Sequence, residues 1–99
     1  MPNVTRDAVA DTIVSQINSF DPMAFAAWGA RSIHNVDKGL VFDTSGIVKW
    51  HGRVTISLNP DDTYTVRFTR MRKLQEVDTE VVDDVCVDNL VRVVDDKVI

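Results

Sequence analysis

The chain has 99 residues, of which 44% are hydrophobic and 26% charged, with only four glycines and three prolines. This composition is typical of a folded domain and excludes a disordered, collagen-like or low-complexity chain. The length predicts a single domain over residues 1–99 with one hydrophobic core. The single cysteine excludes an internal disulfide and indicates a reducing compartment. The longest apolar run, Met23–Trp28, is too short to cross a bilayer, and the charged residues near the N-terminus do not fit a secretory signal.

The net charge of −4 is divided unevenly along the chain. Residues 1–75 hold nine basic and seven acidic residues, whereas residues 76–99 hold two basic and eight acidic ones, so the two parts carry +2 and −6. An acidic segment of this kind can repel nucleic acid, imitate it or keep a small protein soluble. Solubility is the simplest of these three interpretations.

The first expected element is an amphipathic helix over residues 6–18. Its apolar stripe consists of Val9, Ala10, Ile13, Val14 and Ile17. Thr5 is the expected N-cap, and Val4 stands where a hydrophobic staple would contact Val9.

A short second helix is expected over Pro22–Trp28. Asp21 is a favourable N-cap, proline is well tolerated in the first turn, and Gly29 suits the left-handed residue that ends many helices. The segment is apolar nearly all round, which predicts that it is buried in the core rather than docked on a partner.

From Gly39 onward the hydrophobic period changes to two, which predicts an antiparallel meander. One strand begins around residues 40–42, a second spans 48–58, and a third spans 63–69 after a turn that contains Pro60. The inward-facing residues expected on the second and third strands are Trp50, Val54, Ile56, Leu58, Tyr64, Val66 and Phe68.

The C-terminal part of the chain combines two patterns. Acidic residues alternate with valine and threonine over residues 76–81, which indicates a half-buried or edge strand. Apolar residues then recur at helical spacing and predict a terminal helix over residues 84–95, with a further hairpin as the alternative. The expected fold class is α+β, with N-terminal helices and a C-terminal helix packed on one face of a small antiparallel β-meander of three or four strands.

The chain contains no catalytic motif with a recognisable spacing. His34 and His51 lie on different predicted elements. Cys86 has no basic neighbour in the sequence, which predicts an inert and partly buried thiol. Asp61 and Asp62 follow Asn-Pro and are turn residues first. We therefore expect a protein that is not an enzyme and that binds no cofactor or metal.

A basic surface is expected on the outer face of the sheet and just past its third strand. Its members are Lys49, Arg53, Arg67, Arg70, Arg72 and Lys73. Such a surface can neutralise a few phosphates, but the aromatic residues on which single-strand binders stack bases face the core instead. A solvated sheet face is the simpler interpretation.

An acidic surface is expected next to it. Its members are Glu76, Asp78, Glu80, Asp83, Asp84 and Asp88. The last three fall at the start of the terminal helix, whose dipole favours negative charge, whereas the first three have no expected role beyond solubility. Carboxylates roughly 6–7 Å apart along one strand approximate the spacing of phosphates, which allows mimicry of nucleic acid. The acidic surface can also pair with the basic surface of a second copy.

Three segments of the chain form a recognisable pattern: Met23–Arg31, Val54–Phe68 and Val87–Leu90. Together they resemble a family of small accessory proteins carried by bacteriophages and prophages. The family pairs a short apolar segment ending in Gly-Ala with a hairpin of the form TLN…D-Y-V-F and a helix start of the form D-x-L. This chain has Ala27-Trp28 where the family often has Met-Thr, and Ser57 where the hairpin has threonine. The resemblance carries no catalytic residues and implies a phage or mobile-element protein that acts in the cytoplasm of a bacterial cell.

On these grounds we expect a non-enzymatic protein that binds a host protein or ribonucleoprotein complex. The most concrete form of this expectation is an anti-CRISPR-like inhibitor of a bacterial antiviral defence system. One alternative is a small nucleic-acid-binding module that uses the basic surface. Another is a self-associating structural phage component, with the segment around Phe25 and Trp28 at an interface between copies. No membrane partner is expected.

Overall fold

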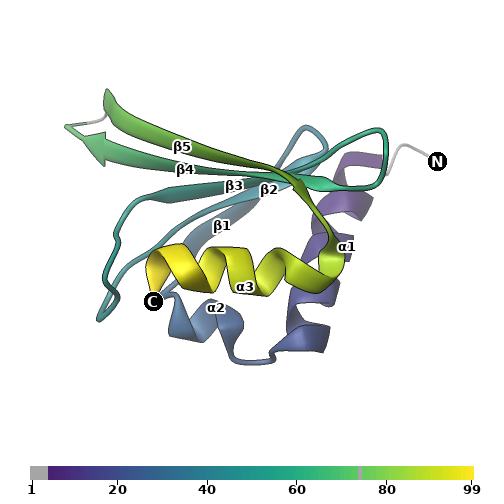
Figure 1. Ribbon diagram of the computed structural model, residues 1–99, viewed down its shortest axis with the longest axis horizontal. Coiled ribbons are helices and arrows are strands. Elements are labelled where there is room, and N and C mark those ends of the chain that lie inside the picture. Colours follow the sequence, from purple (N-terminus) through teal and green to yellow (C-terminus); the bar gives the residue numbers. More distant parts are fainter. Residues whose placement is uncertain (1–4, 74) are drawn as a thin grey trace.

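The computed structural model describes residues 5–73 and 75–99 (Figure 1). In chain order its elements are α1 (Thr5–Phe20), α2 (Ala24–Ala27), β1 (Arg31–Val36), β2 (Gly39–Asp43), β3 (Arg53–Leu58), β4 (Tyr64–Arg72), β5 (Gln75–Val85) and α3 (Val87–Val98). Within these residues the five strands form one antiparallel sheet in sequence order, and the helices cover one of its faces. The predicted α+β meander is therefore confirmed, with five strands in place of three or four.

Helix α1 extends two residues beyond the predicted end at Asn18. Its apolar stripe is confirmed, because Ala10, Ile13 and Ile17 are buried in the core. The helix begins at Thr5, so the residue expected to cap it is already helical. Val4, the other half of the expected staple, lies outside the described residues.

Helix α2 is shorter than predicted, because Pro22 and Met23 form a turn before it. The Asp21 carboxylate accepts the Met23 backbone N–H at 3.0 Å, so it caps that turn and not the helix. The predicted left-handed residue is confirmed at Gly29, whose φ is +60°. A Cβ at Gly29 would collide with the Ser45 carbonyl, so glycine is also required there by close packing.

The sheet differs from the prediction at two strands. The whole of β1 was not predicted, and β3 begins at Arg53 and not at residue 48. Residues 44–52 instead form a loop that folds against the helices: the Ser45 N–H donates to the Trp28 carbonyl at 3.3 Å, and the Lys49 N–H donates to the Val98 carbonyl at 2.9 Å.

Helix α3 is confirmed as a helix but lies three residues further along the chain than predicted. Its stripe of Leu90, Val94 and Val98 is buried against the sheet. The helix begins late because β5 continues to Val85, which keeps the preceding residues in the sheet. None of the helices in the described part of the chain is long and apolar enough to cross a membrane.

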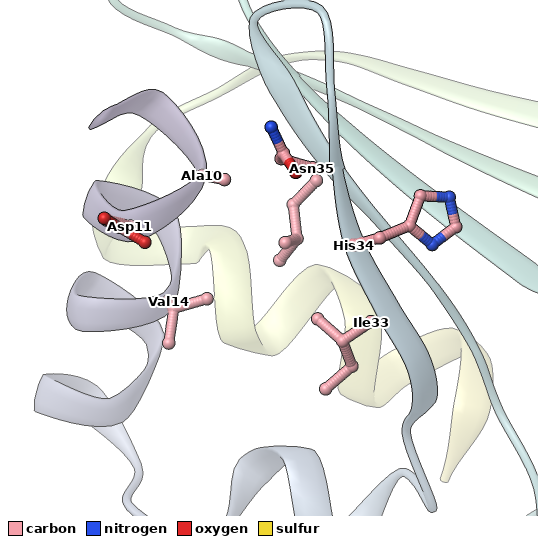
Figure 2. A pocket seen from close by; sticks show the side chains of 7 residues that line it. Ala10, Asp11, Val14, Ile33, His34 and Asn35 are labelled. Carbon is pink, nitrogen blue, oxygen red and sulfur yellow. The ribbon is translucent and has the colours of Figure 1, made fainter. Parts of the chain in front are cut away.

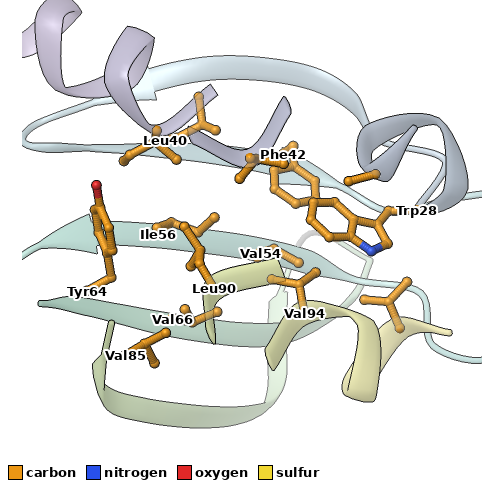
Figure 3. Close-up of a cluster of buried hydrophobic side chains, with 14 of the residues drawn as sticks. Trp28, Leu40, Phe42, Val54, Ile56, Tyr64, Val66, Val85, Leu90 and Val94 are labelled. Carbon is orange, nitrogen blue, oxygen red and sulfur yellow. The ribbon is translucent and has the colours of Figure 1, made fainter. Parts of the chain in front are cut away.

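The hydrophobic core fills the space between the sheet and the helices (Figure 3). The Trp28 ring stacks on the Phe42 ring, with centroids 5.7 Å apart and planes 4° from parallel. Its indole N–H donates to the Asp95 carboxylate of α3 at 2.6 Å. The Tyr64 hydroxyl donates to the Gln16 side-chain carbonyl of α1, also at 2.6 Å. These two bonds tie α3 to the end of α2, and α1 to β4.

Among residues 5–73 and 75–99, one part of the sheet has no helix against it. β4 pairs with β3 as far as Thr69, and beyond that residue it pairs only with β5. The resulting two-stranded arm, residues 70–73 and 75–78, projects past the helices (Figure 1). It carries residues of both predicted charged surfaces.

Candidate interaction surfaces

The structure places most of the predicted acidic surface on a single strand. Glu76, Asp78, Glu80, Asp83 and Asp84 all lie on β5 and are all exposed. Asp88 stands apart from them in the first turn of α3, where negative charge is favourable. The prediction that Asp83 and Asp84 begin the helix is wrong, because both precede Val85, the last residue of the strand.

Two irregularities in β5 decide which face each carboxylate occupies. Arg70 lies opposite Asp78, but Met71 lies opposite Glu76, so Val77 is an extra residue in β5 and forms a bulge. The bulge turns Glu76 to the face opposite that of Asp78 and Glu80. The predicted row of three carboxylates is therefore wrong, and only two of them share a face.

Glu80 has a structural role that the sequence did not predict. It lies on the helix-covered face of the sheet, and its carboxylate accepts from the Lys97 ammonium of α3 at 2.8 Å. The same ammonium lies 5.5 Å from the centre of the Trp50 ring. Glu80 therefore helps to hold the end of α3 against the base of the arm, and solubility is not its only contribution.

The second bulge places Asp83 and Asp84 beside the turn between β3 and β4. Tyr64 pairs with Val85 and Val66 with Val82, so β5 again has one residue more than β4, and Asp84 takes a φ of +58°. The Asp83 carboxylate accepts the Thr65 hydroxyl at 3.0 Å. These residues border a hollow of about 500 Å³ that is also lined by the β3–β4 turn.

The β3–β4 turn adds one perturbed carboxyl group to this hollow. The Thr63 hydroxyl donates to Asp61 at 2.7 Å and the Thr63 backbone N–H donates at 3.2 Å. These two bonds, of which the hydroxyl bond has the larger effect, hold the pKa of Asp61 below its ordinary value. Among the described residues no group of three or more His, Cys, Asp or Glu side chains could hold a metal ion.

The predicted basic surface is wrong as a single face, because its members lie in three places. Arg53 and Arg67 are on the outer face, where Arg53 forms an ion pair with Asp43 at 3.2 Å. Arg70 and Arg72 share a face with Phe68, which is the opposite one, and they lie on the arm. The remaining two residues are Lys49, which lies in the loop before β3, and Lys73, which lies at the end of the arm with a φ of +53°.

The aromatic residues and the groups considered for catalysis are placed as follows. Trp50, Tyr64 and Phe68 pack on the core side of the sheet, as predicted. His34 lies on β1 with its ring on the outer face, away from α1 (Figure 2), whereas His51 lies in the loop that precedes β3. The prediction that Cys86 is partly buried is wrong, since its side chain is exposed between β5 and α3.

A hollow of about 410 Å³ between α1 and β1 was not predicted (Figure 2). Val14 and Leu40 form part of its wall, and Ile33 points into it from β1. The sequence could not indicate this hollow, because the strand that forms one side was itself not predicted. Nothing in its lining selects a particular ligand.

The charged residues thus form three groups. The edge strand β5 is acidic, the end of the arm is basic, and the outer face of the sheet carries charges of both signs. No protein-family model, no curated protein and no solved structure matches this chain.

Proposed function

We propose that this protein acts by binding a cationic surface of a host macromolecular complex, and that this binding inhibits a bacterial antiviral defence system. The observation that supports the proposal is the acidic edge strand β5, which has five exposed carboxylates and no basic residue among its 11 residues. Its partner would be a surface that normally attracts nucleic acid, such as the channel of a defence nuclease or ribonucleoprotein.

Three of the carboxylates are available for a partner. Among the described residues, Glu76, Asp78 and Asp84 accept no hydrogen bond and form no ion pair, whereas Glu80 is bound to Lys97. Exposed charges of one sign raise the rate at which an oppositely charged partner associates and set the orientation in which it docks. The strand is therefore suited to recognition by charge, although its bulges do not reproduce the even spacing of phosphates.

The test measures how far the protein blocks the action of the defence system against an infecting phage, in a bacterium that carries that system. The variant Glu76→Lys with Asp78→Lys reverses two exposed charges and leaves the Glu80–Lys97 pair intact. The control, Asp11→Lys with Asp37→Lys, makes the same charge change on α1 and in the β1–β2 turn, both remote from β5 in sequence and sheet order.

We expect the first variant to lose at least about tenfold in binding, as reversal of two interfacial charges costs more than 1.4 kcal/mol. The control should inhibit as the natural chain does. Equal inhibition by both variants would contradict a role for β5. Equal loss in both would mean that only the net charge matters.

The arm supports a second candidate function, the binding of nucleic acid. Arg70, Arg72 and Lys73 lie within four residues at its end, and a two-stranded ribbon can enter a nucleic-acid groove. If these cations contact three phosphates, the logarithm of the binding constant should fall with the logarithm of salt concentration at a slope of about −2.7. Replacing all three by alanine should remove that slope in a fluorescence anisotropy titration with duplex DNA.

A further inference from the structure

In the described part of the chain β5 is the last strand of the sheet, so one of its edges carries backbone groups that no other strand of that part pairs. The direction of these groups follows from the bond between the Leu58 N–H and the Lys38 carbonyl, which points from β3 toward β2. Backbone groups alternate in direction along a strand, so the even-numbered residues of β3 bond to β2 and its odd-numbered residues bond to β4. These odd-numbered residues pair with odd-numbered residues of β4, so the even-numbered residues of β4 bond to β5.

The same alternation identifies the outward groups of β5. Between the two bulges, the residues opposite the even-numbered positions of β4 are Asp78, Glu80 and Val82, so their backbone groups point toward β4. Thr79 and Val81 consequently direct their N–H and C=O groups away from β4, toward the open edge. These four groups are positioned to form the backbone hydrogen bonds of one additional strand.

The side chains along this edge specify two different faces. Asp78 and Glu80 lie on the helix-covered face of the sheet, whereas Thr79 and Val81 lie on the outer face, where Val81 is 45% exposed. The side chains of an added strand would follow the same alternation. Residues on one face of the added strand would meet the carboxylate of Asp78, which has no ion-pair partner among the described residues, and the carboxylate of Glu80, which is already paired with Lys97. Residues on its other face would meet the β-branched side chains of Thr79 and Val81.

A second copy of this chain is a poor neighbour for this edge. A two-fold pairing centred on Glu80 would set Glu80 against Glu80 of the second copy, and one centred on Thr79 would set Asp78 against Glu80. Like charges directly opposite each other destabilise a strand pair, and charged edge strands are a usual protection against such pairing. Both of these registers are therefore unfavourable, whereas a strand of opposite charge would find attractive partners on the same face.

We propose that β5 takes up one extended segment of its partner as a sixth strand, with lysine or arginine alternating with β-branched apolar residues. The regular stretch between the two bulges, residues 78–82, fits a segment of about five residues, or about 16 Å. This inference rests on the proposed function and names the chemistry of its partner. Backbone hydrogen bonds at Thr79 and Val81 supply affinity, and the alternating faces supply specificity.

The first test uses two synthetic peptides and the isotope-labelled full chain. The peptide Lys-Val-Lys-Val-Lys-Val, blocked at both ends, can add as a strand, whereas Lys-Pro-Lys-Pro-Lys-Pro has the same charge and a much poorer strand geometry. We expect the first peptide to slow amide hydrogen exchange at Thr79 and Val81 about tenfold at saturation and the second to leave it unchanged. Equal binding of the two peptides, or no binding of either, would overturn strand addition.

The second test removes one outward donor. Proline is tolerated in an edge strand where its nitrogen faces solvent, so Thr79→Pro should fold, while Glu80→Pro would break the β4–β5 ladder. We expect Thr79→Pro to weaken binding of the valine peptide about fivefold to tenfold, the effect of one net hydrogen bond. If Thr79→Pro fails to fold, the peptide pair on the unchanged chain still decides the question.

The interference assay separates this inference from the function on which it rests. If Thr79→Pro inhibits fully while Glu76→Lys with Asp78→Lys does not, the partner docks by charge alone, and strand addition is wrong while the proposed function stands. If neither change affects inhibition, the proposed function itself fails. Protection of Thr79 and Val81 that grows with protein concentration in the absence of peptide would instead assign the edge to a second copy and overturn the inference.

Discussion

Replacing Asp95 with alanine tests whether one polar bond fixes α3 against the end of α2. The Asp95 carboxylate accepts the Trp28 indole N–H at 2.6 Å, and the Trp28 side chain is completely buried. A buried donor that loses its acceptor costs about 1–3 kcal/mol, and bonds to charged groups lie in the upper part of that range. We therefore expect Asp95→Ala to lower the free energy of unfolding by about 2 kcal/mol.

The adjacent residue provides the control. Asp95 and Asp96 both lie in the last turn of α3, where the helix dipole disfavours negative charge. Removal of either charge should therefore raise the free energy of unfolding by about 0.3–1 kcal/mol through this effect alone. Asp96 is exposed and accepts no hydrogen bond from the described residues. Asp96→Ala should consequently be neutral or slightly stabilising, and the difference between the two variants isolates the bond to Trp28.

Urea unfolding followed by tryptophan fluorescence measures this difference. With a denaturant slope of about 1–3 kcal/mol per molar, a loss of 2 kcal/mol lowers the midpoint of Asp95→Ala by about 0.7–2 M relative to Asp96→Ala. In the Asp95→Ala background, Trp28→Phe should cost less than it does alone, because the bond is already absent. Identical midpoints for the two alanine variants would show that packing alone holds Trp28.

Three further predictions concern the turns and the core. Thr63→Val removes the hydroxyl bond and keeps the backbone bond, so it should raise the pKa of Asp61 partway toward its ordinary value in an NMR titration. The lowered pKa stabilises the fold above the unfolded pKa and this stabilisation is lost as the pH falls, so the variant should show a smaller loss of stability on the acid side. Burial, opposed by the bond to Gln16, raises the pKa of Tyr64. The stability that Tyr64 contributes is therefore fully present below the unfolded pKa and is lost as the pH rises through the folded pKa. Tyr64→Phe should remove that alkaline loss in urea titrations, at a cost of about 1 kcal/mol at neutral pH. Gly29→Ala should destabilise the fold by more than about 1 kcal/mol by thermal unfolding, because its φ is positive and the site is closely packed.

The elements that the sequence predicted well are those whose burial follows a simple period. Helices α1 and α3 each present one apolar stripe, and the β3–β4 hairpin alternates regularly on both sides of a turn marked by Pro60. In these segments the local sequence pattern and the tertiary contacts agree, so the pattern alone is enough to predict the element. The end positions of the helices were less accurate, because they depend on where neighbouring segments stop.

β1 escaped prediction because it lacks such a pattern. Ser32 takes a φ of +56° at an irregularity in the pairing with β2, which interrupts the alternation, and most of the strand is exposed at the sheet edge. The available signal was the turn chemistry of Asp37-Lys38-Gly39 before β2, which implies a preceding strand. The start of β3 was misplaced for the opposite reason, since Trp50 is partly buried at the position that alternation predicts but reaches the core from a loop.

The charged surfaces could not be predicted from spacing, because a bulge is a property of two paired strands and not of one. In the sequence Glu76, Asp78 and Glu80 are equally spaced, and only the pairing with β4 shows that Val77 is the extra residue. The two bulges remove the even carboxylate row on which mimicry of nucleic acid depended. They also leave a short regular stretch between them whose backbone groups face outward, so the same irregularities that weaken recognition by charge spacing define an edge suited to recognition by backbone pairing.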